Sequence, residues 1–311
     1  MRVINRKLTY ILISILLLSV VSTILQPSFL SFSNIIIVLR QTSILLILSL
    51  GLTGVVLTGN IDLSVGANAA LTGCICAKLL VSGRPIAQAI LLSLMVGIVT
   101  GLCNGLLVGL LKLPSFVATY GVNMVASGIA TIVMNGGIIY DLPAGFTTLG
   151  IGYLGPLPIP VILAAIMYVI FLLVYQKTTL GRNIYMIGYN KLAADYSAVN
   201  SLAVLLIAYI FCGLTGSMGG IILTARLNAA DAGMSEAYGL QIVAAVVVGG
   251  TSLLGGEGGV TGTVLGAMIL TMIVNIMNMN RINSSWQSFV LGLIILVMAW
   301  INIRADRKRT A

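Results

Sequence analysis

Three polar side chains stand close together in an apolar part of the sequence: Asn60, Asp62 and Ser64, bracketed by Gly59 and Gly66. Glycine weakens a helix, so a helix should break here. Asp62 has no basic residue near it in the sequence, and an acid at membrane depth usually faces an interior cavity. Broken helices often line transport pathways. A turn in which Asp62 caps the next helix accounts for the same residues equally well, so both interpretations stay open.

A second break runs from Gly249 to Gly259 and is also rich in glycine. Like the first, it follows an apolar segment and precedes a helix of small residues, which makes the two halves of the chain candidate distant repeats. No Gly-Lys-Ser/Thr follows it, so a phosphate-binding P-loop is disfavoured.

Uncharged hydrogen-bonding side chains near the breaks and in facing apolar segments are candidates for a transport pathway. Together with Asp62 they are Gln41, Asn60, Ser64, Asn104, Asn123 and Asn275. Amide and hydroxyl groups both donate and accept hydrogen bonds, which suits a neutral polyhydroxy cargo. A strongly anionic cargo would call for Arg or Lys at membrane depth, where this sequence has almost none.

Catalysis and metal binding are disfavoured by composition. The chain has no histidine, only seven acidic residues and no Gly-x-Ser-x-Gly motif. Its four cysteines lie in apolar segments, where a buried free cysteine is ordinary. We therefore expect no catalytic residue, no metal site and no cofactor, and any ATP hydrolysis must occur on another chain.

The surrounding elements must be membrane helices. The chain has 311 residues, of which 59% are hydrophobic and 7% charged, whereas soluble domains hold about 25% charged residues. Its long uncharged runs predict an all-α polytopic transmembrane bundle of about ten spans, forming one domain over residues 1–311. The expected spans are 8–26, 35–58, 66–81, 87–111, 116–134, 159–176, 201–224, 238–253, 260–279 and 286–302.

The orientation follows from the basic residues. Ten spans place both termini on one side of the membrane, and eleven of the sixteen Lys and Arg residues fall on that side. The positive-inside rule therefore predicts cytoplasmic termini. The net charge of +9 reflects this bias and attraction to anionic lipid, and it needs no nucleic acid to explain it.

The segment from Lys177 to Asn200 is a polar island between apolar spans. We expect it to be a cytoplasmic loop that docks a soluble partner, because a short helix of small residues lets another protein approach its backbone. The residues expected to make this contact are Gly188, Asn190, Ala193, Ala194 and Asp195. Elsewhere, glycines recur every fourth residue from Gly97 to Gly109, which predicts close packing against another helix.

The motifs together resemble the permease subunits of bacterial ABC importers for ribose and related monosaccharides, including the autoinducer-2 permeases. The resemblance covers nearly the whole chain. Its segments are GNIDLSVG at 59–66, TTLGRNIYMIGYNKLAADYSAV at 178–199, GLTGSMGGIILTARL at 213–227, VVVGGTSLLGGEGGVTGTVLGA at 246–267 and the stretch 275–287.

This resemblance implies several partners. The segment 178–199 corresponds to the loop whose coupling helix docks on a cytoplasmic ABC ATPase. The permease is expected to work as a pair with a second, identical or homologous permease in the bacterial inner membrane, and to receive cargo from an extracytoplasmic sugar-binding protein. Ala198 departs from the family pattern, which usually has glycine there.

Two other classes of protein are weaker alternatives. An ion-coupled secondary transporter usually carries several intramembrane acids or bases, and this chain offers only Asp62 and Glu257. A membrane-embedded enzyme would lack the catalytic groups discussed above.

Overall fold

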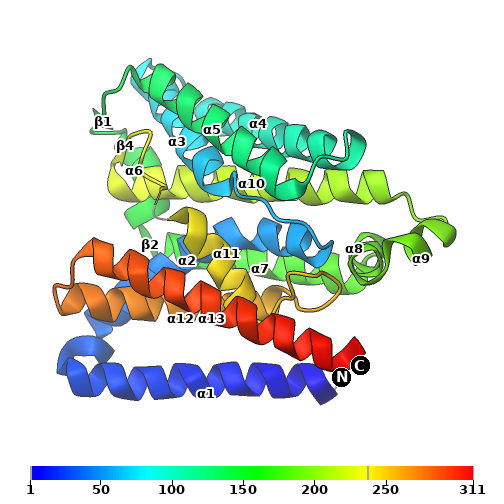
Figure 1. Cartoon of the computed structure of the whole chain (residues 1–311). Coiled ribbons are helices and arrows are strands. Elements are labelled where there is room, and N and C mark those ends of the chain that lie inside the picture. The colour runs from blue at the N-terminus through cyan, green and yellow to red at the C-terminus, as the bar shows by residue number, and fades with distance from the viewer. Residues whose placement is uncertain (1, 237, 311) are drawn as a thin grey trace.

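The computed structural model describes residues 2–236 and 238–310, and helices dominate it (Figure 1). The α-helices are α1 (Arg2–Leu25), α2 (Phe32–Leu57), α3 (Val65–Val81), α4 (Ile86–Gly105), α5 (Ser115–Met134), α6 (Ala144–Ile151), α7 (Ile159–Lys177), α8 (Thr179–Tyr189), α9 (Lys191–Tyr196), α10 (Ser201–Leu227), α11 (Tyr238–Val248), α12 (Val260–Met279) and α13 (Ser284–Thr310). A 3₁₀ turn, η1 (Pro27–Leu30), precedes α2, and a π-helical turn, η2 (Leu106–Leu110), extends α4.

The bundle has two distinct ends. Four two-residue strands form antiparallel pairs, β1 (Ile139–Tyr140) with β4 (Ala229–Ala230) and β2 (Tyr153–Leu154) with β3 (Leu157–Pro158). They lie with α6 at one end, which we call the strand end, whereas α8 and α9 lie at the other, the α9 end (Figure 1). Helix α1 begins and α13 ends at the α9 end (Figure 1).

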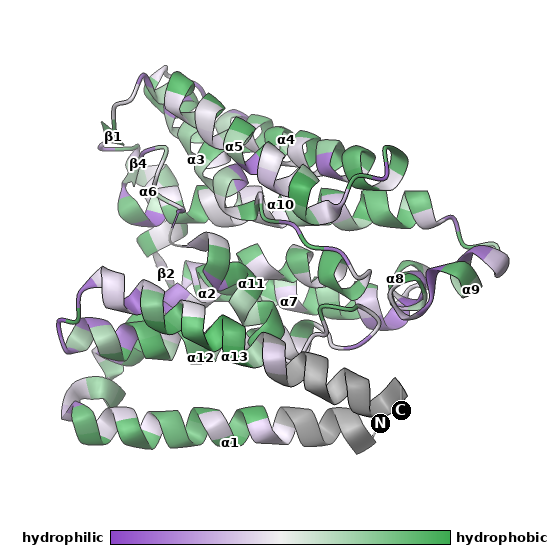
Figure 2. Ribbon diagram, in the orientation of Figure 1, coloured by the Kyte–Doolittle hydropathy of each residue, from purple (hydrophilic) through white to green (hydrophobic). Residues whose placement is uncertain are grey.

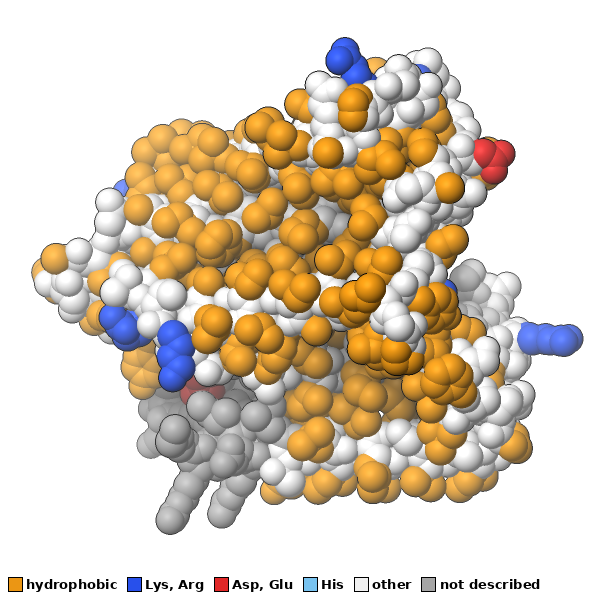
Figure 3. All heavy atoms as spheres, turned by 180° about the vertical axis from the view of Figure 1, so that it is seen from behind, with side chains coloured by type: hydrophobic (Ala, Val, Ile, Leu, Met, Phe, Trp, Pro, Cys, Tyr) orange, Lys and Arg blue, Asp and Glu red, His pale blue; other side chains and the backbone are white. Residues whose placement is uncertain are grey.

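Among the described residues, six helical segments are long and apolar enough to cross a membrane by length and composition: α2, α4 with η2, α5, α7, α10 and α12. Four shorter apolar segments lie in α1, α3, α11 and α13. These ten segments fall where the ten spans were expected. Hydrophobic residues colour most of the long helices (Figure 2), and apolar side chains cover much of the face seen in Figure 3, with Lys and Arg at its margins.

One expectation about helix boundaries was wrong. The span expected over 238–253 ends at Val248, because Gly249 packs backbone to backbone against Gly262 and Gly250 adopts a positive φ of 85°. The polar island, in which a short helix was expected, holds two helices, α8 and α9. They separate at Asn190, whose backbone is extended and whose side chain accepts a hydrogen bond from Ala193 N at 3.0 Å to begin α9.

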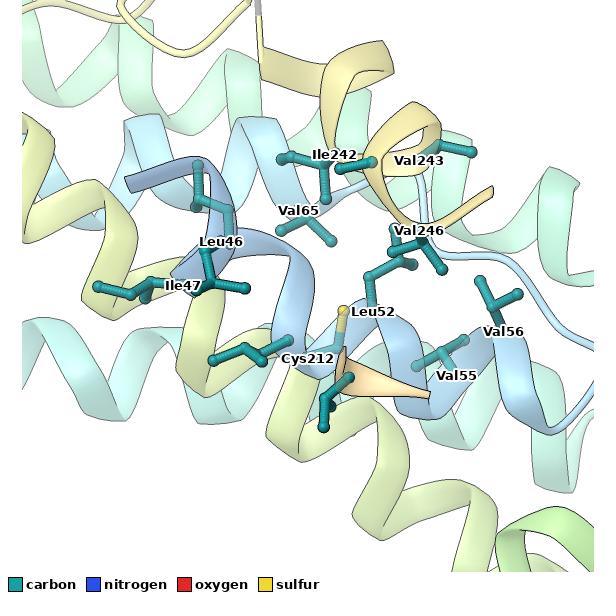
Figure 4. Packing of buried hydrophobic residues seen from close by; sticks show 14 of the residues in the cluster. Leu46, Ile47, Leu52, Val55, Val56, Val65, Cys212, Ile242, Val243 and Val246 are labelled. Carbon is teal, nitrogen blue, oxygen red and sulfur yellow. The ribbon is translucent and has the colours of Figure 1, made fainter. Parts of the chain in front are cut away.

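Helix α11 lies at the centre of the largest apolar cluster. Its residues from Ile242 to Val248 are all buried, as expected for a helix that is hydrophobic all round. Ile242, Val243 and Val246 lie close to side chains of α2 such as Leu46 and Leu52 (Figure 4). This part of the helix is therefore enclosed by protein, whereas Leu240 in its first turn is exposed.

The glycine stripe of α4 packs against α10, as predicted from its spacing. A Cβ atom added at Gly97 would collide with Ser217, and one added at Gly101 with the backbone of Tyr209. On the facing helix, a Cβ atom at Gly213 would collide with the Gly97 carbonyl oxygen. The two helix backbones are in direct contact, an arrangement that small residues permit in membrane helices.

Candidate functional site

The first break is an extended segment between α2 and α3. Helix α2 ends at Leu57 and α3 begins at Val65, and the intervening chain runs from the α9 end back into the bundle (Figure 1). Gly59 adopts a positive φ of 79°, which glycine accommodates without strain. The glycine predicted to break the helix therefore makes the turn.

Asp62, Ser64 and Asn104, three of the residues predicted for the pathway, converge behind this turn. The Asp62 carboxylate accepts hydrogen bonds from Ser64 N at 2.8 Å and from Ser64 Oγ at 2.7 Å. Asn104 Nδ2, from α4, reaches Ser64 Oγ at 2.7 Å and both carboxylate oxygens at 3.3 Å. All three side chains are buried, with Asp62 only 2% exposed. Asp62 therefore caps its own turn and also links it to α4.

The backbone of the break is held by helices from two directions. Ser115 Oγ accepts from Ile61 N at 3.3 Å, and Thr119 Oγ1 accepts from Leu63 N at 3.1 Å, both from α5. Tyr209 Oη, from α10, donates to the Ile61 carbonyl at 3.3 Å. An extended segment needs such partners because its backbone groups have no helical ones.

The other predicted pathway residues lie elsewhere. Asn60 is half-buried and donates to Thr58 Oγ1 at 3.1 Å, within the turn. Asn123 lies half-buried on α5. Asn275, on α12, forms a reciprocal amide pair with Asn34 of α2, with Nδ2 to Oδ1 distances of 3.0 and 2.9 Å.

Gln41 lies in a different part of α2 from the break. It lines a separate cavity together with residues of α11, α12 and α13. The predicted pathway set therefore divides into a cluster at the first break, an interhelical amide pair and one cavity residue.

The two breaks meet at the α9 end of the bundle. Gly256 N, from the second break, donates to the Leu57 carbonyl oxygen at 2.9 Å. A Cβ atom added at Gly59 would lie 3.1 Å from the Leu254 carbonyl oxygen. Gly188, in α8, fits between them, since a Cβ atom there would collide with the Leu57 oxygen. Two breaks about 190 residues apart in the sequence thus share one backbone junction with the polar island.

The residues predicted for partner docking face in two directions. Ala193 is exposed, whereas Ala194 is completely buried against its own chain. Asp195 accepts a hydrogen bond from Ser201 at the start of α10, which fixes the end of α9. Gly188 is used in the junction with Leu57, and Asn190 caps α9. Only part of the predicted docking set is therefore presented outward.

Sequence analysis did not single out the apolar side chains that surround Ala193. Tyr189, Leu192 and Tyr196 are 83%, 70% and 90% exposed. Beside them lies an open pocket of about 390 Å³, lined by residues of α8 and α9 and by Gly256. The sequence could have indicated these residues. A short polar loop has no hydrophobic core in which large apolar side chains could be buried, so they are expected to be exposed.

Other contributors gave no signal in the sequence. Asn34, Ser115 and Thr119 hold the predicted residues in place, but Ser and Thr in membrane helices commonly bond to their own backbone. Thr119 does so as well, since its Oγ1 also donates to the Ser115 carbonyl at 2.7 Å. Their pairing with the first break depends on tertiary structure.

The fold is that of a polytopic helical membrane protein, in which broken helices meet a helical loop at one end of the bundle. Residues 34–299 match the family model described as a branched-chain amino acid transport system / permease component. The chain is 38% identical over 301 residues to the ribose import permease protein RbsC of Bacillus subtilis, covering 96% of this chain and 92% of that protein.

Two further relatives come from Escherichia coli K12. Ribose import permease protein RbsC is 34% identical over 298 residues, covering 94% of this chain and 92% of the relative. The D-allose transport system permease protein AlsC is 30% identical over 269 residues, covering 86% and 82%. No solved structure matches the chain. The chain therefore belongs to the ABC importer permease family that includes these proteins, and it is a multi-pass protein of the bacterial inner membrane.

Proposed function

We propose that this chain is the membrane-spanning permease subunit of an ATP-driven importer for a monosaccharide or a similar small neutral polyhydroxy compound. The observation that carries the proposal is the likeness over 96% of the chain to a ribose import permease. The family model's description names branched-chain amino acids, but an amino acid carries a carboxylate. The polar cluster at the first break offers amide, hydroxyl and carboxylate groups and no Lys or Arg.

ATP hydrolysis is assigned to a separate ATPase that docks on α8 and α9. The exposed side chains of Tyr189, Leu192 and Tyr196 are suited to bind a soluble partner. They lie in a polar loop, which is not expected to enter the lipid bilayer. In this arrangement the α9 end is cytoplasmic, both termini lie on that side and the chain crosses the membrane about ten times. Segment 177–200 is then the coupling loop of a single transmembrane domain.

The remaining partners follow from the two ends of the bundle. An extracytoplasmic sugar-binding protein is assigned to the strand end, where α6 and the short strands form the connections. A second permease, the same or homologous, completes the pathway within the bilayer.

The test is uptake by proteoliposomes that hold the permease, its ATPase and its binding protein. We expect ATP-dependent accumulation of D-ribose or D-allose and none of leucine. Uptake of leucine with no neutral sugar transported would refute the cargo assignment. ATP-independent uptake that collapses when the proton gradient is dissipated would favour an ion-coupled transporter, the alternative for which the buried Asp62 is the supporting observation.

A further inference from the structure

A polar cavity lies between α2, α11, α12 and α13, apart from the cluster at the first break. Its volume is about 180 Å³, and its polar lining comes from Gln41, Tyr238, Gln241, Thr271 and Gln287. Leu45 and Val274 supply an apolar wall. The helices that carry these residues lie together in the lower half of the bundle in Figure 1. We call this cavity the amide pocket.

One side chain that lines the amide pocket has a buried oxygen atom that accepts no hydrogen bond from the described residues. Gln41 Oε1 is buried and has no hydrogen-bond partner among the described residues. A buried polar atom left in this state costs about 1–3 kcal/mol, so its retention in a cavity points to a ligand that donates to it.

Two other lining groups are oriented as acceptors by the bonds they already make. Gln287 Nε2 donates to Asn278 Oδ1 at 2.7 Å and to the Ile282 carbonyl at 3.2 Å, so the group it can offer a ligand is its carbonyl oxygen. Thr271 Oγ1 donates its proton to the Ala267 carbonyl at 2.7 Å, which leaves its lone pairs.

This donor and acceptor inventory selects a class of ligand. Three acceptors call for a molecule with several O–H donors, and the phenol of Tyr238 and the amide of Gln241 can donate as well as accept. A carboxylate or phosphate offers only acceptors when ionised, so it would leave Gln41 and Gln287 unpaired. A cavity of about 180 Å³ has room for a small polyol stripped of its hydration shell.

We propose that the amide pocket holds the neutral polyhydroxy cargo during its passage through the subunit, with Gln41, Gln287 and Thr271 accepting from its hydroxyls. This inference rests on the proposed function and names the site at which that function is carried out. It places the cargo contact on the opposite half of α2 from the first break, where the Asp62 carboxylate already accepts hydrogen bonds from Ser64 and Asn104.

The experiment uses the reconstituted complex with its ATPase and binding protein, and D-ribose as the probe. The variants are Gln41→Leu, Gln241→Leu and Thr271→Val, the last of which removes a hydroxyl at nearly constant volume. The matched control is Gln88→Leu, at an exposed glutamine on α4. Each pocket variant should assemble and hydrolyse ATP normally but lower the maximal rate of uptake by about tenfold, which is the effect of losing one good hydrogen bond. The half-saturating ribose concentration should barely change, because the binding protein sets it.

The possible outcomes distinguish failure of the pocket assignment from failure of the proposed function. Ribose uptake at the parental rate by Gln41→Leu and Thr271→Val would overturn the pocket assignment while the importer assignment stands. If the parent complex transports no neutral sugar, the proposed function itself fails. If a pocket variant does not assemble, Gln41→Asn and Gln241→Asn decide the question, since they keep the amide but withdraw it by one methylene and should still slow uptake.

Discussion

The backbone N–H of Gly256 donates to the carbonyl oxygen of Leu57 at 2.9 Å, joining the second break of the chain to the end of α2. Gly188 of α8 packs directly on the same carbonyl. The polar island is thus in backbone contact with both breaks, and no flexible side chain lies between them. A shift of α8 must therefore be accommodated by the breaks themselves.

Gly188→Ala should uncouple the transporter. Its Cβ atom would collide with the Leu57 carbonyl oxygen and approach Gly256 N, so α8 must move away from the breaks. Overpacking of this kind costs about 1–3 kcal/mol, and we expect transport to fall by about tenfold or more while ATP hydrolysis persists. The ratio of sugar transported to ATP hydrolysed is the measurement. Gly128→Ala is the control, because Gly128 is a helical glycine with open space around it. An unchanged ratio in Gly188→Ala would show that the junction does not couple ATP hydrolysis to transport.

Ala193→Trp and Ala194→Trp should fail in different ways. Ala193 is exposed, so the larger side chain should leave the subunit folded and weaken binding of the ATPase. Ala194 is fully buried, so its variant should lower the thermal stability of the isolated permease. Co-purification of the ATPase and melting in detergent distinguish the two. Full ATPase binding by Ala193→Trp would count against docking on this face of α9.

Gly101→Ala should destabilise the bundle by about 1–3 kcal/mol, because the added methyl group meets the backbone of Tyr209 and pushes α4 away from α10. Gly128→Ala adds the same methyl group to α5 in open space and should be neutral or slightly stabilising, since alanine is the better helix former. Thermal unfolding in detergent compares them. Equal melting temperatures would contradict the close packing of α4 and α10.

Asn34 and Asn275 should prove to be a structural pair. Each amide donates to the other, and Asn275 is only 4% exposed, so neither is presented to a cargo. A double-mutant cycle with alanine at both positions should give a coupling of about 0.6–1.7 kcal/mol, the range found between membrane helices. If Asn275→Ala transports ribose more slowly at unchanged stability, the original assignment of Asn275 to the pathway is restored.

Asp62→Asn should keep the fold and slow transport. Asparagine can still accept from Ser64 N and cap the turn. It removes the charge, and hydrogen bonds to a charged acceptor are roughly twice as strong as neutral ones, so the link to Asn104 should loosen. Expression and uptake are measured together. Uptake equal to that of the parent would confine the role of Asp62 to its turn.

Much of this fold was predictable because a membrane imposes strict rules on a sequence. Among the described residues, unbroken apolar runs predicted the bounds of nine apolar helical segments to within a few residues, and the spacing of Gly97 to Gly109 predicted a helix contact. The span expected over 238–253 overlapped the break predicted from Gly249, and the helix ends where that break begins, at Val248.

The candidate site was less predictable because it is made by contacts between distant segments. Asp62, Ser64 and Asn104 were identified by residue type, but the bond from Asn104 crosses 40 residues to Ser64. Asn34 and Asn275 are 241 residues apart, so no local pattern distinguishes their mutual pairing from an exposure to cargo. Gln241 and Gln287 looked like ordinary polar residues near helix ends until the fold placed them with Gln41.

Helix α11 is eleven residues long, about 16 Å at 1.5 Å per residue. One of its ends supplies Tyr238 and Gln241 to the amide pocket, and the other leads into the glycine loop that contacts Gly188. One short helix and the glycine loop that follows it therefore connect the residues of the amide pocket to the backbone junction at Gly188.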